Sequence, residues 1–262
     1  MQIVAFVIIS SLARVGICIS IEYELQKATM KLQKETENRQ GVRNRWYDDA
    51  CGTAFALDLI GERWSILIIR ELLFGPRRFS ELRAGLPGIS AKILTQRLEG
   101  LEASRILKKR KAPPPLSAQV YELTEWGYEA ESIIQMLGKW ATRHPNHDPT
   151  LPLSAASIMM SFRTMIAPDR ARNLIAKAGF RIGQDQFVVT IRDGAIETQR
   201  GETEDADFTF TASAEMLAAA VYGGEPIETL EKAGLLMVEG DRKLAKQFIT
   251  LFVLPEKLQE EV

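Results

Sequence analysis

Residues 77–111 read RRFSELRAGLPGISAKILTQRLEGLEASRILKKRK and hold ten lysine or arginine residues against three acidic ones. The whole chain of 262 residues has a formal net charge of −1, so the positive charge is concentrated in this one segment. Such a concentration indicates either an anionic partner or a solvated basic face. The order of the elements predicted within the segment favours the anionic partner.

Two helices separated by a tight turn are predicted at the start of this segment. The first spans residues 79–86, Pro87-Gly88-Ile89 forms the turn, and Ser90 is expected to cap the second helix. At 100° per residue, one apolar stripe of the second helix is formed by Ala91, Leu94, Leu98 and Leu101. The opposite side presents Lys92, Gln96 and Glu99, with Thr95 beside them. A helix-turn-helix has this geometry, and its second helix enters the major groove.

A basic wing is predicted directly after the second helix. Residues 107–111 (LKKRK) and 120–123 (VYEL) read as two short strands around a hairpin that contains three consecutive prolines. A hairpin of this composition suits a position beside the phosphate backbone. Helix-turn-helix and wing together predict a winged DNA-binding domain at residues 46–143.

Two classes of DNA contact are expected from these side chains. The base edges are assigned to Lys92, Thr95 and Gln96, because glutamine suits adenine and lysine suits guanine. The phosphate contacts are assigned to Ser90, Arg97, Lys108, Lys109, Arg110 and Lys111, together with Arg77 and Arg78.

Residues 51–64 (CGTAFALDLIGERW) resemble the opening of the HxlR-type winged helix-turn-helix regulators. The similarity continues through LLFGPRRFSEL (72–82), LPGIS (86–90), LTQRL (94–98) and YELT (121–124), and it covers residues 50–141. This resemblance implies a cytoplasmic, sequence-specific transcriptional regulator. It also implies a homodimer that binds an inverted repeat in double-stranded DNA.

A helix predicted at residues 125–143 has more apolar side chains than a domain of this size can bury. They are Ile133, Ile134, Met136, Leu137 and Trp140. By resemblance, this helix pairs with the same helix of a second subunit and sets two recognition helices about one DNA turn apart. The alternative is that it packs against the C-terminal domain.

Cys51 has two interpretations. In several members of the resembling family, a cysteine at this position senses oxidants or electrophiles. Asp48 and Asp49 precede it and are expected to raise the pKa of its thiol, which favours a structural cysteine. Because Cys18 lies in the N-terminal segment, a sensor at Cys51 would need an intersubunit or mixed disulfide. Two cysteines also exclude a disulfide scaffold and a cysteine-rich zinc site.

The N-terminal segment, residues 1–45, is predicted to lie outside the folded domains. Residues 1–21 are apolar but interrupted by Arg14, so they predict no membrane span, and their first charge comes too late for a signal peptide. We interpret them as a translated leader, with Met30 as the more natural start. Residues 22–45 are charged and predict a loose helix or disorder.

A linker is predicted at residues 144–156, where three prolines interrupt any periodicity. His144 and His147 lie in it, but no carboxylate or thiol pattern completes a metal site around them. A second domain follows at residues 157–254, and residues 255–262 form a tail. The elements expected in the second domain begin with a helix over 157–178, with Pro168 at a helix start, and strands at 187–191, 195–200 and 206–211. They continue with a helix capped by Ser213, a helix at 226–232, a strand at 235–238 and a helix at 242–252.

This second domain is similar to the sterol-carrier-protein type of lipid-binding domain, most clearly in ADFTFTASAEML (206–217) and VEGD (238–241). The resemblance implies an α+β fold with a mostly antiparallel sheet and an apolar tunnel. The candidate lining residues are Met159, Met160, Met165, Phe187, Phe210, Met216, Tyr222, Met237 and Phe248. Each of these side chains also suits an ordinary core.

The sequence therefore predicts an α+β protein in which a winged helix-turn-helix regulator precedes a sterol-carrier-like domain. A hydrophobic ligand in that domain is the hypothesis for regulation. The sequence contains no P-loop, no Gly-x-Ser-x-Gly motif and no zinc signature. We therefore expect no catalysis and no cofactor. One alternative is a lipid or acyl carrier whose winged domain binds proteins, and another is a regulator whose input is oxidation of Cys51.

Overall fold

The computed structural model describes residues 26–27, 30, 47–113 and 117–259. The expectations for residues 1–21, and most of those for residues 22–45, fall outside these ranges. The chain divides into two compact units, residues 1–58 and 59–262, and the second unit contains the second domain and the part of the winged domain from residue 59 onward. Among the described residues, no helix is both long enough and apolar enough to cross a membrane.

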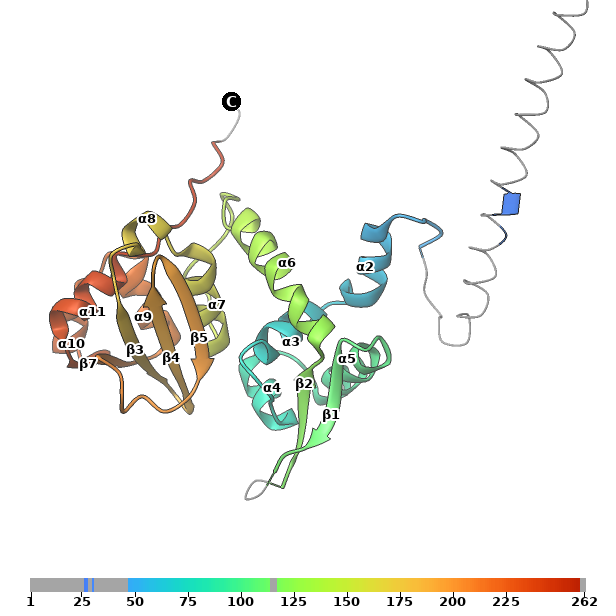
Figure 1. The fold of residues 1–262 in the computed structure, drawn as a ribbon, viewed down its shortest axis with the longest axis horizontal. Helices are drawn as coiled ribbons and strands as arrows, with labels where there is room; N and C mark the ends of the chain where they lie inside the picture. The colour runs from blue at the N-terminus through green and yellow to red at the C-terminus, as the bar shows by residue number, and fades with distance from the viewer. Residues whose placement is uncertain (1–25, 28–29, 31–46, 114–116, 260–262) are drawn as a thin grey trace, which may run out of the picture. The chain divides into compact units, whose positions relative to one another are not determined.

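The first half of the second unit has the winged helix-turn-helix order that the sequence predicts (Figure 1). After α2 (Gly52–Ile60), which begins in the first unit, come α3 (Ser65–Leu72), α4 (Phe79–Gly85), α5 (Ala91–Ala103), β1 (Leu107–Lys111), β2 (Gln119–Leu123) and α6 (Glu125–Ala141). The turn between α4 and α5 contains Gly88 at φ 90°, a backbone conformation that favours glycine. The predicted helix-turn-helix and wing are therefore confirmed.

The recognition helix α5 begins where the sequence places it, because the Ser90 hydroxyl accepts a hydrogen bond from the Ile93 amide at 3.2 Å. Leu94, Leu98 and Leu101 are buried as expected, but Ala91 is exposed. At 100° per residue, Ala91 lies about 50° from the centre of the stripe that the three leucines define. Including Ala91 in the buried stripe was therefore wrong.

The wing is a β-hairpin with a third segment attached to it. Strands β1 and β2 pair antiparallel from Leu107 opposite Leu123 to Lys111 opposite Gln119. Arg77 adds an isolated bridge to β2, since its amide donates to the Tyr121 carbonyl at 2.9 Å and its carbonyl accepts from the Tyr121 amide at 2.8 Å. Arg77, which precedes the N-cap residue of α4, is thereby fixed to the wing.

The second domain is an α+β domain, as predicted. Its elements are α7 (Ala155–Met165), α8 (Pro168–Ala171), β3 (Ala176–Ile182), β4 (Asp185–Arg192), β5 (Ala195–Arg200), β6 (Phe208–Ala212), α9 (Ala214–Val221), α10 (Ile227–Lys232), β7 (Leu236–Gly240) and α11 (Arg242–Ile249). The strand order is β5-β4-β3-β6-β7, in which β3 and β6 are parallel and the other neighbours are antiparallel.

The central strand β3 differs from the prediction, because the sequence predicts a helix to residue 178 and no strand at Ala176–Ile182. Pro168 does begin a helix, but α8 is one turn long and Ala176–Ile182 then pairs with both β4 and β6. The Ala-Lys-Ala start of this strand favours a helix locally, and pairing on both sides overrides that weak preference. A Cβ at Gly179 would lie 2.5 Å from the Thr209 hydroxyl oxygen, so a larger residue there would clash with β6.

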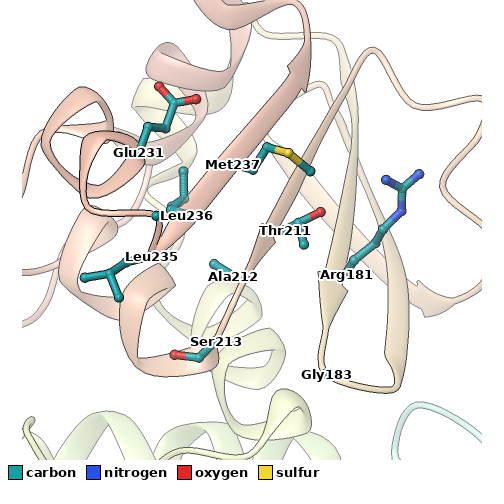
Figure 2. Close-up of a pocket in the computed structure, with 10 residues that line it drawn as sticks. Arg181, Gly183, Thr211, Ala212, Ser213, Glu231, Leu235, Leu236 and Met237 are labelled. Carbon is teal, nitrogen blue, oxygen red and sulfur yellow. The ribbon is translucent and has the colours of Figure 1, made fainter.

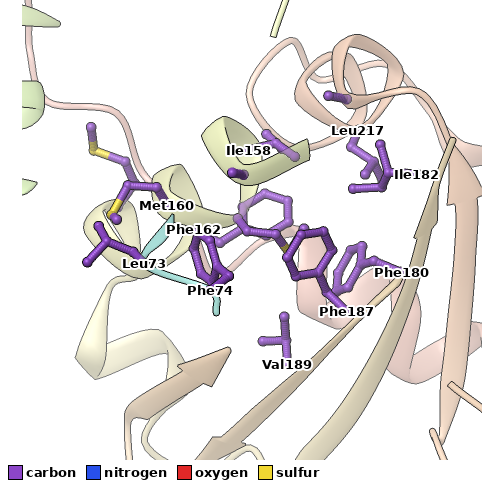
Figure 3. Packing of buried hydrophobic residues seen from close by; sticks show 14 of the residues in the cluster. Leu73, Phe74, Ile158, Met160, Phe162, Phe180, Ile182, Phe187, Val189 and Leu217 are labelled. Carbon is purple, nitrogen blue, oxygen red and sulfur yellow. The ribbon is translucent and has the colours of Figure 1, made fainter. Parts of the chain in front are cut away.

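The core of the second domain is a cluster of phenylalanine side chains (Figure 3). Phe180 lies between Phe162, Phe210 and Phe248, with ring centroids 5.6–5.7 Å away. All four rings are almost fully buried. Aromatic side chains at these separations fill the space between the sheet and the helices with protein atoms.

Gly127 in α6 gives a direct test of the packing in the winged domain, because a Cβ there would lie 2.1 Å from the Ile106 carbonyl oxygen. We expect Gly127→Ala to lower the free energy of unfolding by about 3 kcal/mol, the cost of an overpacked core. The measurement is chemical denaturation followed by circular dichroism. Gly100→Ala is the control, since no described atom lies within 4 Å of the added Cβ, and it should be neutral or slightly stabilising. Equal stabilities of the two variants would contradict the described packing.

Candidate nucleic-acid interface

The predicted base-reading residues share one solvent-exposed face of α5. Lys92, Thr95 and Gln96 are all exposed, whereas the leucines on the other side of the helix are buried against the domain. Ser90 caps the helix through its hydroxyl and is itself exposed at the N-terminal end. The first turns of α5 thus present an ammonium, a hydroxyl and an amide toward solvent, which are groups that can bond base edges.

Arg97 lies in a different environment from the one the sequence suggested. Its Nη2 lies 2.8 Å from a Glu62 carboxylate oxygen, and its Nε donates to the Arg63 carbonyl at 3.0 Å. These contacts fix α5 to the segment that precedes α3. We therefore assign Arg97 to positioning of the recognition helix rather than to a phosphate.

The basic residues of the wing remain near its surface, and three of them have acidic neighbours. Lys109 lies 2.8 Å from Glu102, which raises the pKa of the lysine, while Arg110 pairs with Glu122 and Lys108 lies 3.9 Å from Glu122. Exposed ion pairs of this kind contribute little, so a phosphate can replace them at small cost. Lys111 is exposed at the end of β1, next to the hairpin tip.

The two arginines before α4 separate into different roles. Arg78 is the N-cap residue of α4, and its exposed guanidinium pairs with Glu81 at 2.6 Å. Arg77 instead turns into the second domain, where its guanidinium binds Asp185 at 2.7 Å and is 13% exposed. We therefore assign Arg77 to this ion pair rather than to a phosphate, because its guanidinium is largely buried against a carboxylate 108 residues away.

Helix α6 has both an exposed apolar face and a packed face. Ile133, Met136, Leu137 and Trp140 are exposed, whereas Ile134 is buried. On the packed side, the Glu131 carboxylate lies 2.7 Å from the Arg163 guanidinium of α7, and burial raises the pKa of this carboxyl group. The two alternatives for this helix are thus compatible, since one face contacts the second domain and the other is free for a second subunit.

Cys51 is exposed immediately before α2. The amide and hydroxyl of Thr53 and the amide of Ala54 bond the sulfur and lower the pKa of the thiol. The pKa is thus lowered and not raised as Asp48 and Asp49 alone would suggest, because N–H groups at a helix start stabilise a thiolate directly. The exposed position also argues against a buried structural cysteine.

The predicted ligand-lining residues do not share one environment. Phe187, Phe210 and Phe248 are buried, as are Met159, Met160 and Met165, while Met216 and Tyr222 are partly buried. The Tyr222 hydroxyl bonds Ser161 at 2.7 Å, and burial raises its pKa. Met237 alone of the nine lines a surface pocket of about 740 Å³, shown in Figure 2.

This surface pocket was not found from the sequence. Its walls come from the ends of β3, β6 and β7 and from the segment after α10, including Thr211, Leu235 and Leu236. The exposed Leu235 beside a glycine was the available signal, but one exposed leucine is common on protein surfaces.

His144 and His147 contact each other through backbone atoms, and no group of three or more potential metal ligands occurs in the described ranges.

The two domains match two different families. The HxlR-like helix-turn-helix family matches residues 59–149, and the SCP-2 sterol transfer family matches residues 162–253. The HTH-type transcriptional regulator YvaP of Bacillus subtilis is 38% identical over 87 residues, which span 33% of this chain and 81% of YvaP.

The regulator YodB of Bacillus subtilis is also 38% identical, over 86 residues that span 33% of this chain and 77% of YodB. The solved structure of reduced YodB is 34% identical and covers 38% of this chain and 99% of that chain, with a TM-score of 0.34. Because the chain covers more than two thirds of these relatives in sequence, it belongs to the HxlR family of helix-turn-helix transcriptional regulators, with an SCP-2-like domain fused after the winged domain.

Proposed function

We propose that this protein is a cytoplasmic, homodimeric regulator that reads an inverted-repeat operator in double-stranded DNA. The observation that carries the proposal is the exposed face formed by Lys92, Thr95 and Gln96 at the start of α5, next to a basic wing. Side chains at the N-terminal end of a recognition helix can reach base edges in the major groove. The wing lysines then neutralise phosphates without reading sequence.

The second subunit is proposed to pack on the apolar face of α6. This face has Ile133, Met136 and Trp140 at spacings of three and four residues, so they form one continuous stripe. A contiguous stripe of exposed, large apolar side chains is typical of an interface. A two-fold dimer then gives the two recognition helices the symmetry of an inverted repeat.

Regulation by a hydrophobic ligand is proposed to involve the second domain. The phenylalanine core is filled, so a ligand would either displace these rings or occupy the surface pocket that Met237 lines. A ligand changes operator affinity only by binding one dimer arrangement more tightly than another. A lipid carrier without DNA binding is less well supported, because the polar face of α5 and the basic wing are both retained.

Oxidation of Cys51 is a second candidate input. The specific observation is an exposed thiol whose pKa is lowered by hydrogen bonds at the start of α2. A lower pKa increases the thiolate fraction near neutral pH, and the thiolate is the reactive form.

Gln96→Ala and Lys111→Ala should differ in their effects on DNA binding. Gln96→Ala removes a base contact, so it should weaken the cognate operator by about 1–3 kcal/mol and relax the preference at one base pair. Lys111→Ala should weaken cognate and random DNA equally and flatten the salt dependence by about one unit. Fluorescence anisotropy at several salt concentrations measures both. Identical discrimination between cognate and random DNA in Gln96→Ala and the wild type would contradict the assignment.

Met136→Glu should convert the dimer into a monomer, because it places a carboxylate in an apolar interface. Sedimentation velocity measures the change. Ile175→Glu is the matched control, since Ile175 is 69% exposed and Met136 is 66% exposed, but Ile175 lies outside α6. A dimer that survives Met136→Glu, or that Ile175→Glu disrupts equally, would remove α6 as the interface.

Alkylation of Cys51 should reach half of its maximal rate at a lower pH than alkylation of an unstructured cysteine peptide. The sign follows from the lowered pKa, since the thiolate then persists to lower pH. Mass spectrometry of the Cys51 peptide after timed iodoacetamide treatment provides the rates. Thr53→Val removes one donor to the sulfur and should shift the profile to higher pH. Overlapping profiles for the protein and the peptide would refute the activated thiol.

A further inference from the structure

Arg77 belongs to the winged domain through its backbone. Its amide and carbonyl make two hydrogen bonds with Tyr121 of β2, at 2.9 and 2.8 Å. Arg78, the next residue, is the N-cap of α4. The position of Arg77 therefore affects both the wing and the first helix of the helix-turn-helix.

The side chain of Arg77 contacts the second domain. Its Nη1 and Nη2 donate to the two carboxylate oxygens of Asp185 at 2.7 and 3.3 Å. The two side chains are 13% and 20% exposed, so the ion pair is largely removed from solvent. A planar guanidinium that engages both carboxylate oxygens is fixed in orientation as well as in position.

Asp185 also serves a second guanidinium. It accepts a hydrogen bond from Arg200 of β5 at 2.5 Å, and the Arg200 guanidinium lies 4.5 Å from the centre of the Phe187 ring. Burial and the positive charge of Arg77 lower the pKa of Arg200. The Nε atoms of both arginines and Nη2 of Arg200 are buried without a hydrogen-bond partner among the described residues. Glu81 lies 3.9 Å from Arg77 Nε, so Asp185 is the closer counter-charge.

Three other contacts join the two domains independently of Asp185. The hydroxyl of Ser154, the N-cap of α7, donates to the buried Glu71 carboxylate at 2.6 Å. Phe74 meets Phe187 edge to face with ring centroids 5.6 Å apart, and Arg163 pairs with Glu131. Figure 3 labels both rings within the buried cluster. Loss of the Asp185 charge should therefore release Arg77 without separating the domains.

We propose that Asp185, in the second domain, is a positioning residue for DNA reading by the winged domain. It holds the Arg77 guanidinium, and the Arg77 backbone in turn holds β2 of the wing and the start of α4. The inference rests on the proposed operator binding and extends it, because it makes the fused domain a structural part of the DNA reader. Without the carboxylate, two guanidiniums repel each other in a partly buried site, and Arg77 moves away.

The test is a double-mutant cycle on the full-length protein with Asp185→Asn, Arg77→Gln and both together. The operator Kd is measured by anisotropy over a range of salt concentrations. Each single variant should raise Kd about tenfold, and the double variant should be no worse than either single one, because the pair acts as a unit. The salt dependence should not change, since no phosphate contact is lost.

Amide hydrogen exchange gives a readout that needs no DNA. The Tyr121 amide should exchange faster in Asp185→Asn, because its bond to the Arg77 carbonyl is loosened. Glu239→Gln is the matched control, since it weakens the 2.5 Å Arg181–Glu239 pair between β3 and β7 in the same sheet. It should leave both Tyr121 exchange and operator Kd at the wild-type values.

Two results would overturn the proposal. One is an Asp185→Asn protein with wild-type Kd and wild-type Tyr121 exchange. The other is an Arg77→Gln protein whose salt dependence is flatter by about one unit, because that identifies Arg77 as a phosphate ligand. If the wild type itself binds no operator, the proposed function fails, while the exchange experiment still tests the positioning role. If Asp185→Asn does not fold, Arg77→Lys replaces it and should raise Kd in the same direction by a smaller factor.

Discussion

The Arg77 side chain crosses from the winged domain to the sheet of the second domain and finds its counter-charge there. A guanidinium in a partly buried site requires a carboxylate, so the β3–β4 turn must keep Asp185 opposite the segment before α4. Phe74 against Phe187 and Ser154 against Glu71 act in the same direction. The DNA-reading elements are therefore fixed by contacts from both domains.

Helix α6 makes this arrangement relevant to regulation. One of its faces contacts α7 through Glu131 and Arg163, and its other face presents a free apolar stripe. A change in the second domain can reach the proposed dimer interface through the first face and the wing through Arg77. This connection requires no ligand in the phenylalanine core.

Most of the fold was predictable from local sequence patterns, whereas contacts between residues far apart in the sequence were not predictable. The helix-turn-helix and the wing follow from leucine spacing, the Ser90 cap and the glycine in the turn, which are all encoded within a few residues. Strand β3 was missed because the preference of Ala176 and its neighbours for a helix gives way to pairing on both sides. The Arg77–Asp185 pair spans 108 residues and has no local signal. The pKa of Cys51 depends on the amides of the following helix, which the acids adjacent in sequence do not reveal.

The most direct test of the account is to incubate the purified protein with a genomic fragment library at about physiological salt and to sequence the retained DNA. We expect enrichment of a short inverted repeat with half-sites about one helical turn apart, as two α5 helices related by a two-fold axis require. Retention without sequence preference, or no retention, would contradict a dimeric operator reader. Either result would favour the alternative function, in which the second domain is a lipid or acyl carrier.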